Sequence, residues 1–164
     1  MIHPVPIYLG SVSQAEAFRP EFNFSLVKVQ DLRYGENPHQ RAAFYKDPGI
    51  TGPCIANAVQ IHGKELSYNN ILDANSALEL VREFSEPSAV IIKHNNPCGT
   101  ATAEDLPAAY RKAFAADTVS AYESIVAVNR TLDGDTAAEM AKIILEAFHA
   151  PELTHRSFRI FAQE

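Results

Sequence analysis

The feature that most constrains the fold is an alternation of short apolar runs with helical patterns in the second half of the chain. Residues 88–93 (SAVIIK) and 124–129 (SIVAVN) are continuous apolar runs, as expected of strands that are buried on both faces. Residues 69–84 place apolar side chains at helical spacing, and residues 104–116 carry Pro107 in a predicted first helical turn. This strand–helix–strand order predicts an α/β layered fold with a largely parallel central sheet.

The other expected elements depend on weaker patterns. They are strands at residues 24–30, 42–46, 54–63 and 157–162 and a long amphipathic helix at residues 135–148. Residues 31–41 and 47–53 are rich in Gly, Pro and Asn, which indicates loops. We expect residues 1–23 to be a leader or the remnant of a linker, and residues 24–164 to form one domain.

Composition limits the class of function. A chain of 164 residues is long enough to bury its own core, and a net charge of −6 argues against general affinity for nucleic acid or anionic membranes. Two cysteines cannot build a disulfide framework, and no apolar run approaches the roughly 18 residues of a membrane span. The first residues lack the pattern of a signal peptide. The expectation is a cytoplasmic protein with reduced thiols, binding neither nucleic acid nor membrane.

Chemically useful side chains follow the first buried strand without a spacer. Lys93 supplies a positive charge, and His94 is a proton acceptor that is tunable near neutral pH. Asn95 and Asn96 offer amides that could orient a substrate, and Gly99 would let the backbone approach a ligand closely. The alternative is a polar β-turn after a core strand, with Lys93 solvated and His94 capping a carbonyl.

Two further segments are candidates for binding an anion. In the loop at residues 32–40, Arg33 could grip a phosphate through parallel N–H donors and Tyr34 could stack on a planar ring. Residues 63–74 bring Asn70 and other polar side chains to a predicted helix start. The alternatives are a surface contact for the loop, and a helix N-cap at Ser67 or Asn69 for the second segment.

A zinc site of the deaminase type is not expected. That signature requires H-x-E followed by P-C-x-x-C, because a histidine and two thiolates hold the metal and the glutamate moves protons. Pro97-Cys98 starts the second motif, but Ala101 stands where the second thiolate is needed. None of the six histidines is followed two positions later by Glu. The sequence therefore predicts no metal.

Four segments together resemble a known family. They are DLRYGENPHQ (31–40), LSYNNILDA (66–74), IIKHNNPCG (91–99) and DTVSAYESIVAVNR (117–130). In this order they resemble the AICAR transformylase domain of bifunctional purine biosynthesis enzymes. The resemblance runs from about Phe24 through at least Arg130, which is most of the chain.

The resemblance implies a fold, an activity and roles for particular residues. That domain has a cytidine-deaminase-like fold, present as two tandem halves without zinc, and this chain would be the first half. It transfers a formyl group from 10-formyltetrahydrofolate to the amine of aminoimidazole carboxamide ribonucleotide (AICAR), and it works as a homodimer. By motif position, Lys93 and His94 would be the catalytic pair. Arg33 and Tyr34 would hold the nucleotide, with Asn70 close to it.

The chain also departs from the family pattern. The family usually reads Ala-Phe-Gly-Gly where residues 121–124 here are Ala-Tyr-Glu-Ser. Glu123 and Ser124 would matter if the glycines have positive φ or touch ligand, and would be harmless if Glu123 faces solvent. The second tandem half, which supplies much of the folate contact, is absent from this sequence.

Three hypotheses therefore follow from the sequence. The chain is the Lys-His half of a formyltransferase, a nucleotide-binding module without catalysis, or a structural subunit that serves through its dimer surface. The first predicts binding of nucleotide and folate, the second binding of nucleotide alone, and the third binding of neither.

Overall fold

The computed structural model describes residue 21 and residues 23–162, and the α/β class predicted from the sequence is confirmed. The elements, in chain order, are β1 (Val27–Leu32), β2 (Ala42–Lys46), the 3-10 helix η2 (Ile55–Asn57), α1 (Tyr68–Val81), β3 (Ser88–Lys93), β4 (Asn96–Thr102), α2 (Leu106–Ala116), β5 (Ser124–Val128), α3 (Gly134–Met140), β6 (Leu145–His149) and α4 (His155–Phe161). The expected leader, residues 1–23, lies almost entirely outside the described residues.

The main sheet has the strand order β4-β3-β5-β6, and the expectation of a largely parallel centre is wrong. Strand β3 is antiparallel to both of its neighbours, and only β5 and β6 are parallel. The reason is that β3 and β4 are joined by a two-residue turn, which can connect only antiparallel strands. Helix α2 then leads from β4 to β5 across the intervening β3.

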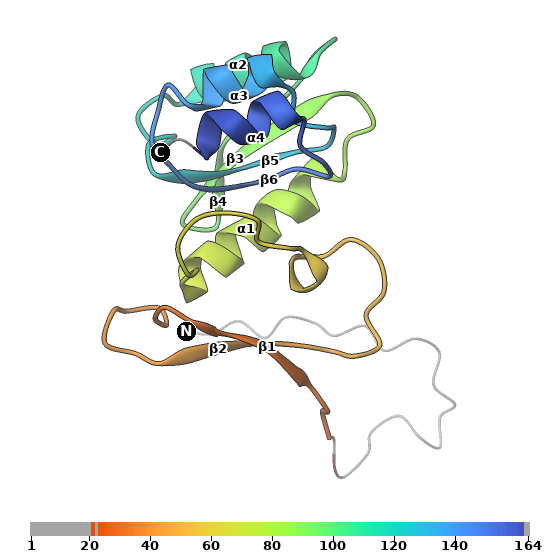
Figure 1. The fold of residues 1–164 in the computed structure, drawn as a ribbon, viewed down its shortest axis with the longest axis vertical. Helices are drawn as coiled ribbons and strands as arrows, with labels where there is room; N and C mark the ends of the chain where they lie inside the picture. Colours follow the sequence, from red (N-terminus) through yellow and green to blue (C-terminus); the bar gives the residue numbers. More distant parts are fainter. Residues whose placement is uncertain (1–20, 22, 163–164) are drawn as a thin grey trace.

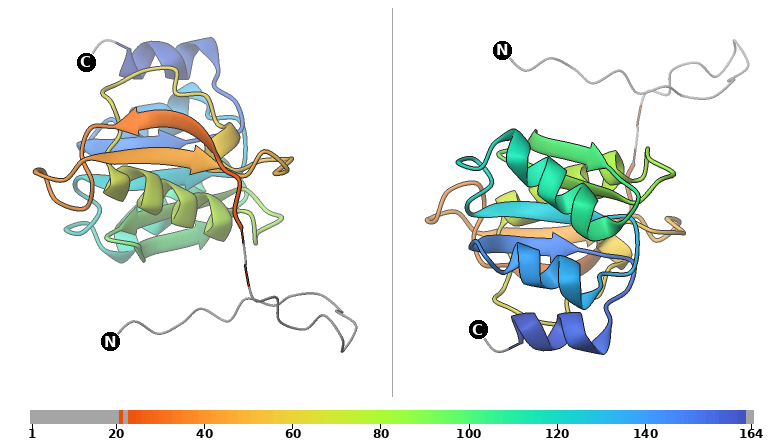
Figure 2. Two further views of the ribbon diagram at one scale, coloured as in Figure 1. Left: turned by 90° about the horizontal axis from the view of Figure 1, so that it is seen from below. Right: turned by 90° about the horizontal axis from the view of Figure 1, so that it is seen from above.

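Helices cover both faces of this sheet, and the strand alternation sorts the core accordingly (Figures 1 and 2). Ile91 belongs to a cluster with α2 and α3, whereas Val90 and Ile92 belong to a cluster with α1. Because successive side chains of a strand point to opposite faces, one fully apolar strand supplies both cores. The antiparallel ribbon β1–β2 lies beyond α1 and does not join the main sheet (Figure 1).

Three predicted elements differ in type from the structure. Residues 54–63 do not form a strand, since their one regular element is the short helix η2. The helix expected at 135–148 ends at Met140, and the chain turns to build β6. Residues 157–162 lie largely in helix α4, whose Thr154 cap accepts a hydrogen bond from the Ser157 amide, and not in a strand.

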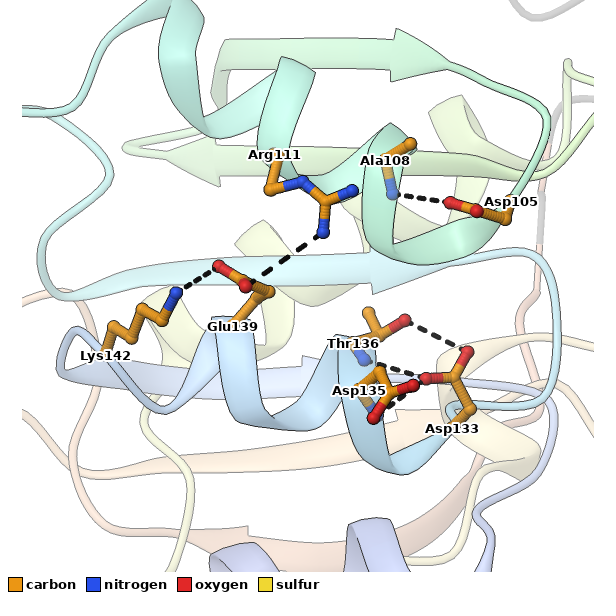
Figure 3. A network of polar contacts seen from close by, with 8 residues as sticks. All are labelled: Asp105, Ala108, Arg111, Asp133, Asp135, Thr136, Glu139 and Lys142. Atoms are coloured by element: carbon orange, nitrogen blue, oxygen red, sulfur yellow. Dashed lines mark hydrogen bonds and ion pairs between the residues drawn. The ribbon is translucent and has the colours of Figure 1, made fainter.

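Polar contacts fix the helices on the face of the sheet away from α1 (Figure 3). Asp105 caps α2 by accepting from the Ala108 amide, and Asp133 caps α3 by accepting from two amides. Between the helices, Glu139 contacts Arg111 at 4.0 Å and Lys142 at 2.6 Å. The hydrogen bond from Lys142 lowers the pKa of the Glu139 carboxyl. These contacts orient α2 and α3 on one face of the sheet. The candidate site lies on the other face, beside α1.

Candidate active site

The Lys93–Asn96 segment forms a hairpin with a two-residue turn, so its backbone is the polar β-turn that the sequence offered as the alternative. Lys93 ends β3 and pairs with Asn96, the first residue of β4. His94 and Asn95 between them have φ of 53° and 62°, in the left-handed region. Consecutive positive φ values are the requirement of a type I′ hairpin turn, which matches the twist of the two strands. The turn therefore places the His94 side chain, which is exposed, at the tip of the hairpin.

Helix α1 holds this turn through its side chains. The Asp73 carboxylate accepts a hydrogen bond from the His94 amide at 3.1 Å and another from the Asn95 amide at 2.7 Å. The Ser76 hydroxyl donates to the side-chain oxygen of Asn95, and the Asn96 side chain donates to the His94 carbonyl at 2.9 Å. Asn95 and Asn96 thus stabilise the turn, whereas no side chain in residue 21 and residues 23–162 hydrogen-bonds to the His94 imidazole.

Lys93 points to the loop before β5. Its ammonium donates a hydrogen bond to the Tyr122 carbonyl oxygen at 2.5 Å. The next residue, Glu123, has φ of 53°, so the position where the family usually carries Gly does require the left-handed region. The Glu123 side chain is exposed. Ser124 is 1% exposed and donates its hydroxyl to the Ala121 carbonyl at 2.7 Å, so its polar group is satisfied locally.

Arg33 and Tyr34 lie in a loop that is fastened to the start of α1. The Arg33 amide donates to the Leu66 carbonyl at 2.9 Å, and the Tyr68 amide donates to the Tyr34 carbonyl at 3.0 Å. The Arg33 guanidinium lies 4.8 Å from the centre of the Tyr34 ring and donates to its hydroxyl at 3.2 Å. In this state the guanidinium covers the ring, so a ring ligand that stacks on that face of Tyr34 must displace it.

An open cavity of about 340 Å³ lies beside the Arg33 loop. The residues that line it include Arg33, His39 and Arg41, together with Asp31. Because arginine forks match the geometry of phosphate oxygens, this cavity is chemically suited to a phosphorylated ligand. The concentration of basic groups here is local, since the net charge of the whole chain is −6.

Asn70 has a structural role in the described structure. It forms a capping box with Ser67: the Ser67 hydroxyl accepts from the Asn70 amide, and the Asn70 side-chain oxygen accepts from the Ser67 amide at 2.9 Å. Its side-chain nitrogen lies 3.4 Å from a Glu146 carboxylate oxygen on β6. This confirms Ser67 as the N-cap, and it accounts for the 9% exposure of Asn70.

Gly99 of β4 packs directly against helix α2. A Cβ atom built on it would come within 2.1 Å of the Ala113 carbonyl oxygen in α2. The missing side chain therefore permits close packing of helix on strand, and Gly99 contacts α2 where the sequence reasoning expected a ligand. The neighbouring Cys98 thiol is partly buried, and burial raises its pKa.

Helix α1 contacts two of the predicted site segments: the Arg33 loop at its first residue, and the His94 turn at Asp73 and Ser76. At a rise of 1.5 Å per residue, Tyr68 and Asp73 are separated by about 8 Å along the helix axis. The tip of the hairpin and the basic loop thus flank the same helix. Gly99 is not part of this arrangement, since it packs against α2.

The residue that sequence reasoning missed is Asp73. Its signal was the spacing of Asn70, Asp73 and Ser76, which forms a polar row at i, i+3 and i+6 on the helix. Such a row beside the apolar stripe of a buried helix indicates contacts to neighbouring loops.

In the described residues no helix is long and apolar enough to cross a membrane. Likewise, no group of three or more potential metal-ligating side chains was found in residue 21 and residues 23–162.

Comparison with known proteins agrees with the motif pattern. The family model described as "AICARFT/IMPCHase bienzyme" matches residues 5–164. The chain is 48% identical over 157 residues to the bifunctional purine biosynthesis protein PurH of Acetivibrio thermocellus, covering 96% of this chain and 30% of that protein. It is 55% identical over 141 residues to PurH of a Thermoanaerobacter species, covering 86% of this chain and 28% of the relative.

A third relative gives the same result. PurH of Listeria monocytogenes is 48% identical over 157 residues, which cover 96% of this chain and 31% of that protein. The chain thus spans a little under a third of the length of the curated relatives it matches. The four motifs, the α/β fold and these matches agree: the chain belongs to the AICARFT/IMPCHase bienzyme family.

Proposed function

We propose that this chain carries the nucleotide-binding loop and the Lys-His pair of an AICAR formyltransferase that acts in purine biosynthesis. The observation that carries the proposal is the convergence on α1: the Arg33–Tyr34 loop is bonded to its start, and the His94 turn to its Asp73. A basic loop and an imidazole carried on a backbone turn that the same helix holds are suited to a phosphorylated, weakly nucleophilic amine.

The chemistry assigns a role to each member of the pair. The AICAR amine conjugates with its ring and carboxamide, so it attacks the formyl carbon well only if its proton is removed as the new bond forms. His94 would accept that proton on an imidazole nitrogen. Lys93 would stabilise the oxyanion of the tetrahedral intermediate, or protonate the folate nitrogen as the carbon–nitrogen bond breaks. The Tyr122 carbonyl, 2.5 Å from the Lys93 ammonium, supports this role by fixing the position of the charge.

Arg33 would bind the phosphate of the nucleotide, in or beside the basic cavity. Its guanidinium has room to change partners, because its contacts are a neutral hydroxyl and a ring and not a carboxylate. Tyr34, once uncovered, would offer its ring to the imidazole of AICAR. The family resemblance adds 10-formyltetrahydrofolate as co-substrate. The remaining folate contacts would come from a second copy or from a partner that supplies the other half.

The alternative is a nucleotide-binding module without catalysis. What favours it is that the basic residues beside Arg33 can bind a phosphate whether or not formyl transfer takes place. Such a module would bind AICAR through Arg33 but would neither bind a folate nor transfer its formyl group when mixed with the remainder of a PurH protein.

The test is calorimetric titration of the 164-residue protein with AICAR. Replacing Arg33 by Ala should weaken binding by at least tenfold, because a charge-assisted contact to phosphate is lost. Arg159→Ala is the matched control, since Arg159 is an exposed arginine on α4, remote in the fold from the loop. Equal affinity of the parent and Arg33→Ala would contradict the nucleotide site. A formyl-transfer assay with an added second half then separates the enzyme from the binding module.

A further inference from the structure

Asp73 is the charged group of α1 that reaches the turn bearing His94. Its two carboxylate oxygens accept from two consecutive backbone amides, Oδ2 from His94 at 3.1 Å and Oδ1 from Asn95 at 2.7 Å. Hydrogen bonds to a carboxylate are shorter and stronger than those between neutral groups. One side chain therefore fixes both central residues of the hairpin turn.

This support answers a conformational problem in the sequence. A type I′ turn needs two residues in the left-handed region, and Asn-Gly or Gly-Gly usually supply them because glycine has no Cβ to clash. This chain has His94 and Asn95 there, with φ of 53° and 62°. His94 is thus held in a backbone conformation that its own side chain disfavours, and the compensating contacts come from Asp73 outside the hairpin and from Asn96 within it.

We propose that Asp73 is a positioning residue for His94, which holds the strained turn so that the imidazole has one direction relative to α1. The inference rests on the proposed function, because it takes His94 to be the group that meets the AICAR amine. It adds that the alignment is set by the helix that also anchors the Arg33 loop through Leu66 and Tyr68. The nucleotide site and the base would thereby share one rigid support.

The test is a double-mutant cycle between Asp73→Ala and Asn95→Gly in the 164-residue protein. Glycine at position 95 adopts the left-handed region without help, so it should relieve the part of the turn that Asp73 holds through the Asn95 amide. Asp73→Ala alone should weaken AICAR binding by about tenfold, the effect of losing a hydrogen bond to a charged acceptor. The same change in the Asn95→Gly background should cost about threefold or less, because the glycine retains the turn. A carboxylate that touched the ligand directly would not be rescued in this way.

A second readout does not depend on AICAR. Hydrogen exchange of the His94 and Asn95 amides, followed by NMR, should be at least tenfold faster in Asp73→Ala than in the parent. In the double variant the exchange rate of the His94 amide should be near that of the parent. Glu79→Ala is the matched control, since Glu79 is an exposed carboxylate of the same helix and pairs with Arg82 rather than with the turn. Asp73→Asn, which keeps one acceptor oxygen, should lie between Asp73→Ala and the parent, and serves if the alanine variant does not fold.

The outcomes separate the two proposals. If the parent does not bind AICAR, the proposed function of the isolated chain fails, and the exchange rates alone decide about Asp73. If the parent binds AICAR and loses affinity in Arg33→Ala, but Asp73→Ala behaves like Glu79→Ala in both measurements, the nucleotide site stands and the positioning role is overturned. A loss of affinity that is equal in the parent and Asn95→Gly backgrounds also overturns it.

Discussion

The ammonium of Lys93 donates a hydrogen bond to the backbone carbonyl of Tyr122, and the two atoms lie 2.5 Å apart. This carbonyl belongs to the backbone of the loop before β5, so it fixes the position of the ammonium. A carboxylate in its place would also neutralise the positive charge, which the carbonyl does not. The position of Lys93 therefore depends on the peptide between Tyr122 and Glu123, and on the left-handed conformation of the latter. Substitutions at Glu123 can therefore test the conformation of this loop.

Replacing Glu123 by Gly should stabilise the protein by about 1 kcal/mol, because a residue with a Cβ is strained at φ of 53° and glycine is not. The free energy of unfolding is measured by urea denaturation. Glu123→Ala is the control, since it removes the carboxylate but keeps the Cβ and the strain. Equal effects of the two changes would show that charge, and not backbone conformation, controls this position.

Replacing Gly99 by Ala should destabilise the protein by about 1–3 kcal/mol, the usual cost of forcing an extra carbon into a packed core. The new Cβ would lie 2.1 Å from the Ala113 carbonyl oxygen, so α2 must move away from β4. Gly49→Ala is the comparison, because the nearest atom to its Cβ is a side-chain oxygen of Asp47 at 3.2 Å. Thermal unfolding that is unchanged in Gly99→Ala would contradict the packing role.

Replacing Asn70 by Ala should destabilise the protein by about 1–2 kcal/mol, as expected when a helix cap is removed and buried polar groups lose their partners. The Ser67 amide and hydroxyl both donate to the Asn70 oxygen at 2.9 Å. Asn69→Ala, which removes a single exposed contact to the Glu36 carbonyl, should have little effect on chemical denaturation. If both variants unfold like the parent, the capping box contributes no measurable stability.

His149 should make the stability fall as the pH is lowered through about 6.5. Burial lowers its pKa below the ordinary histidine value of 6.5, and its Nδ1 atom is buried with no hydrogen-bond partner among the described residues. Above that value both the folded and unfolded states are neutral, so the stability is complete. Below it the unfolded state binds more protons, and unfolding becomes easier.

The measurement is denaturation at several pH values between 5 and 7.5. In His149→Asn the loss of stability over this range should be smaller than in the parent. His155→Asn, at an exposed position on α4, should leave the parent's pH dependence in place. A slope that changes equally in both variants would count against burial as the cause.

The elements that could be predicted from the sequence are those whose pattern is local in the chain, and the elements that depend on pairing with a distant strand could not. The apolar runs that became β3 and β5 and the helix α1 were predicted because their patterns are long and local. The hairpin was not, because residues 96–102 (NPCGTAT) are poor in β-branched apolar residues and gain their strand conformation by pairing with β3. The turn at His94 lacks the glycine that would have marked it.

The end of α3 shows a second kind of failure. The helical pattern continues past Met140, but β5 offers a parallel edge, and Leu145–His149 pair with it. Local propensity is a small energy, and tertiary pairing overrides it. The candidate site residues were found by motif, whereas Asp73 and the Tyr122 carbonyl act through contacts across 21 and 29 residues of sequence that only the fold reveals.

The hydrogen bonds at the beginning of α1 have a consequence for motion. Helix ends fray, and the amides of Arg33 and Tyr68 take part in the same set of bonds that joins the basic loop to the first turn. Ser67 and Asn70 add the capping box, which reaches Glu146 on β6. We therefore expect the helix end and the Arg33 loop to open together in one local unfolding event, so that the helix cap limits how often the loop rearranges.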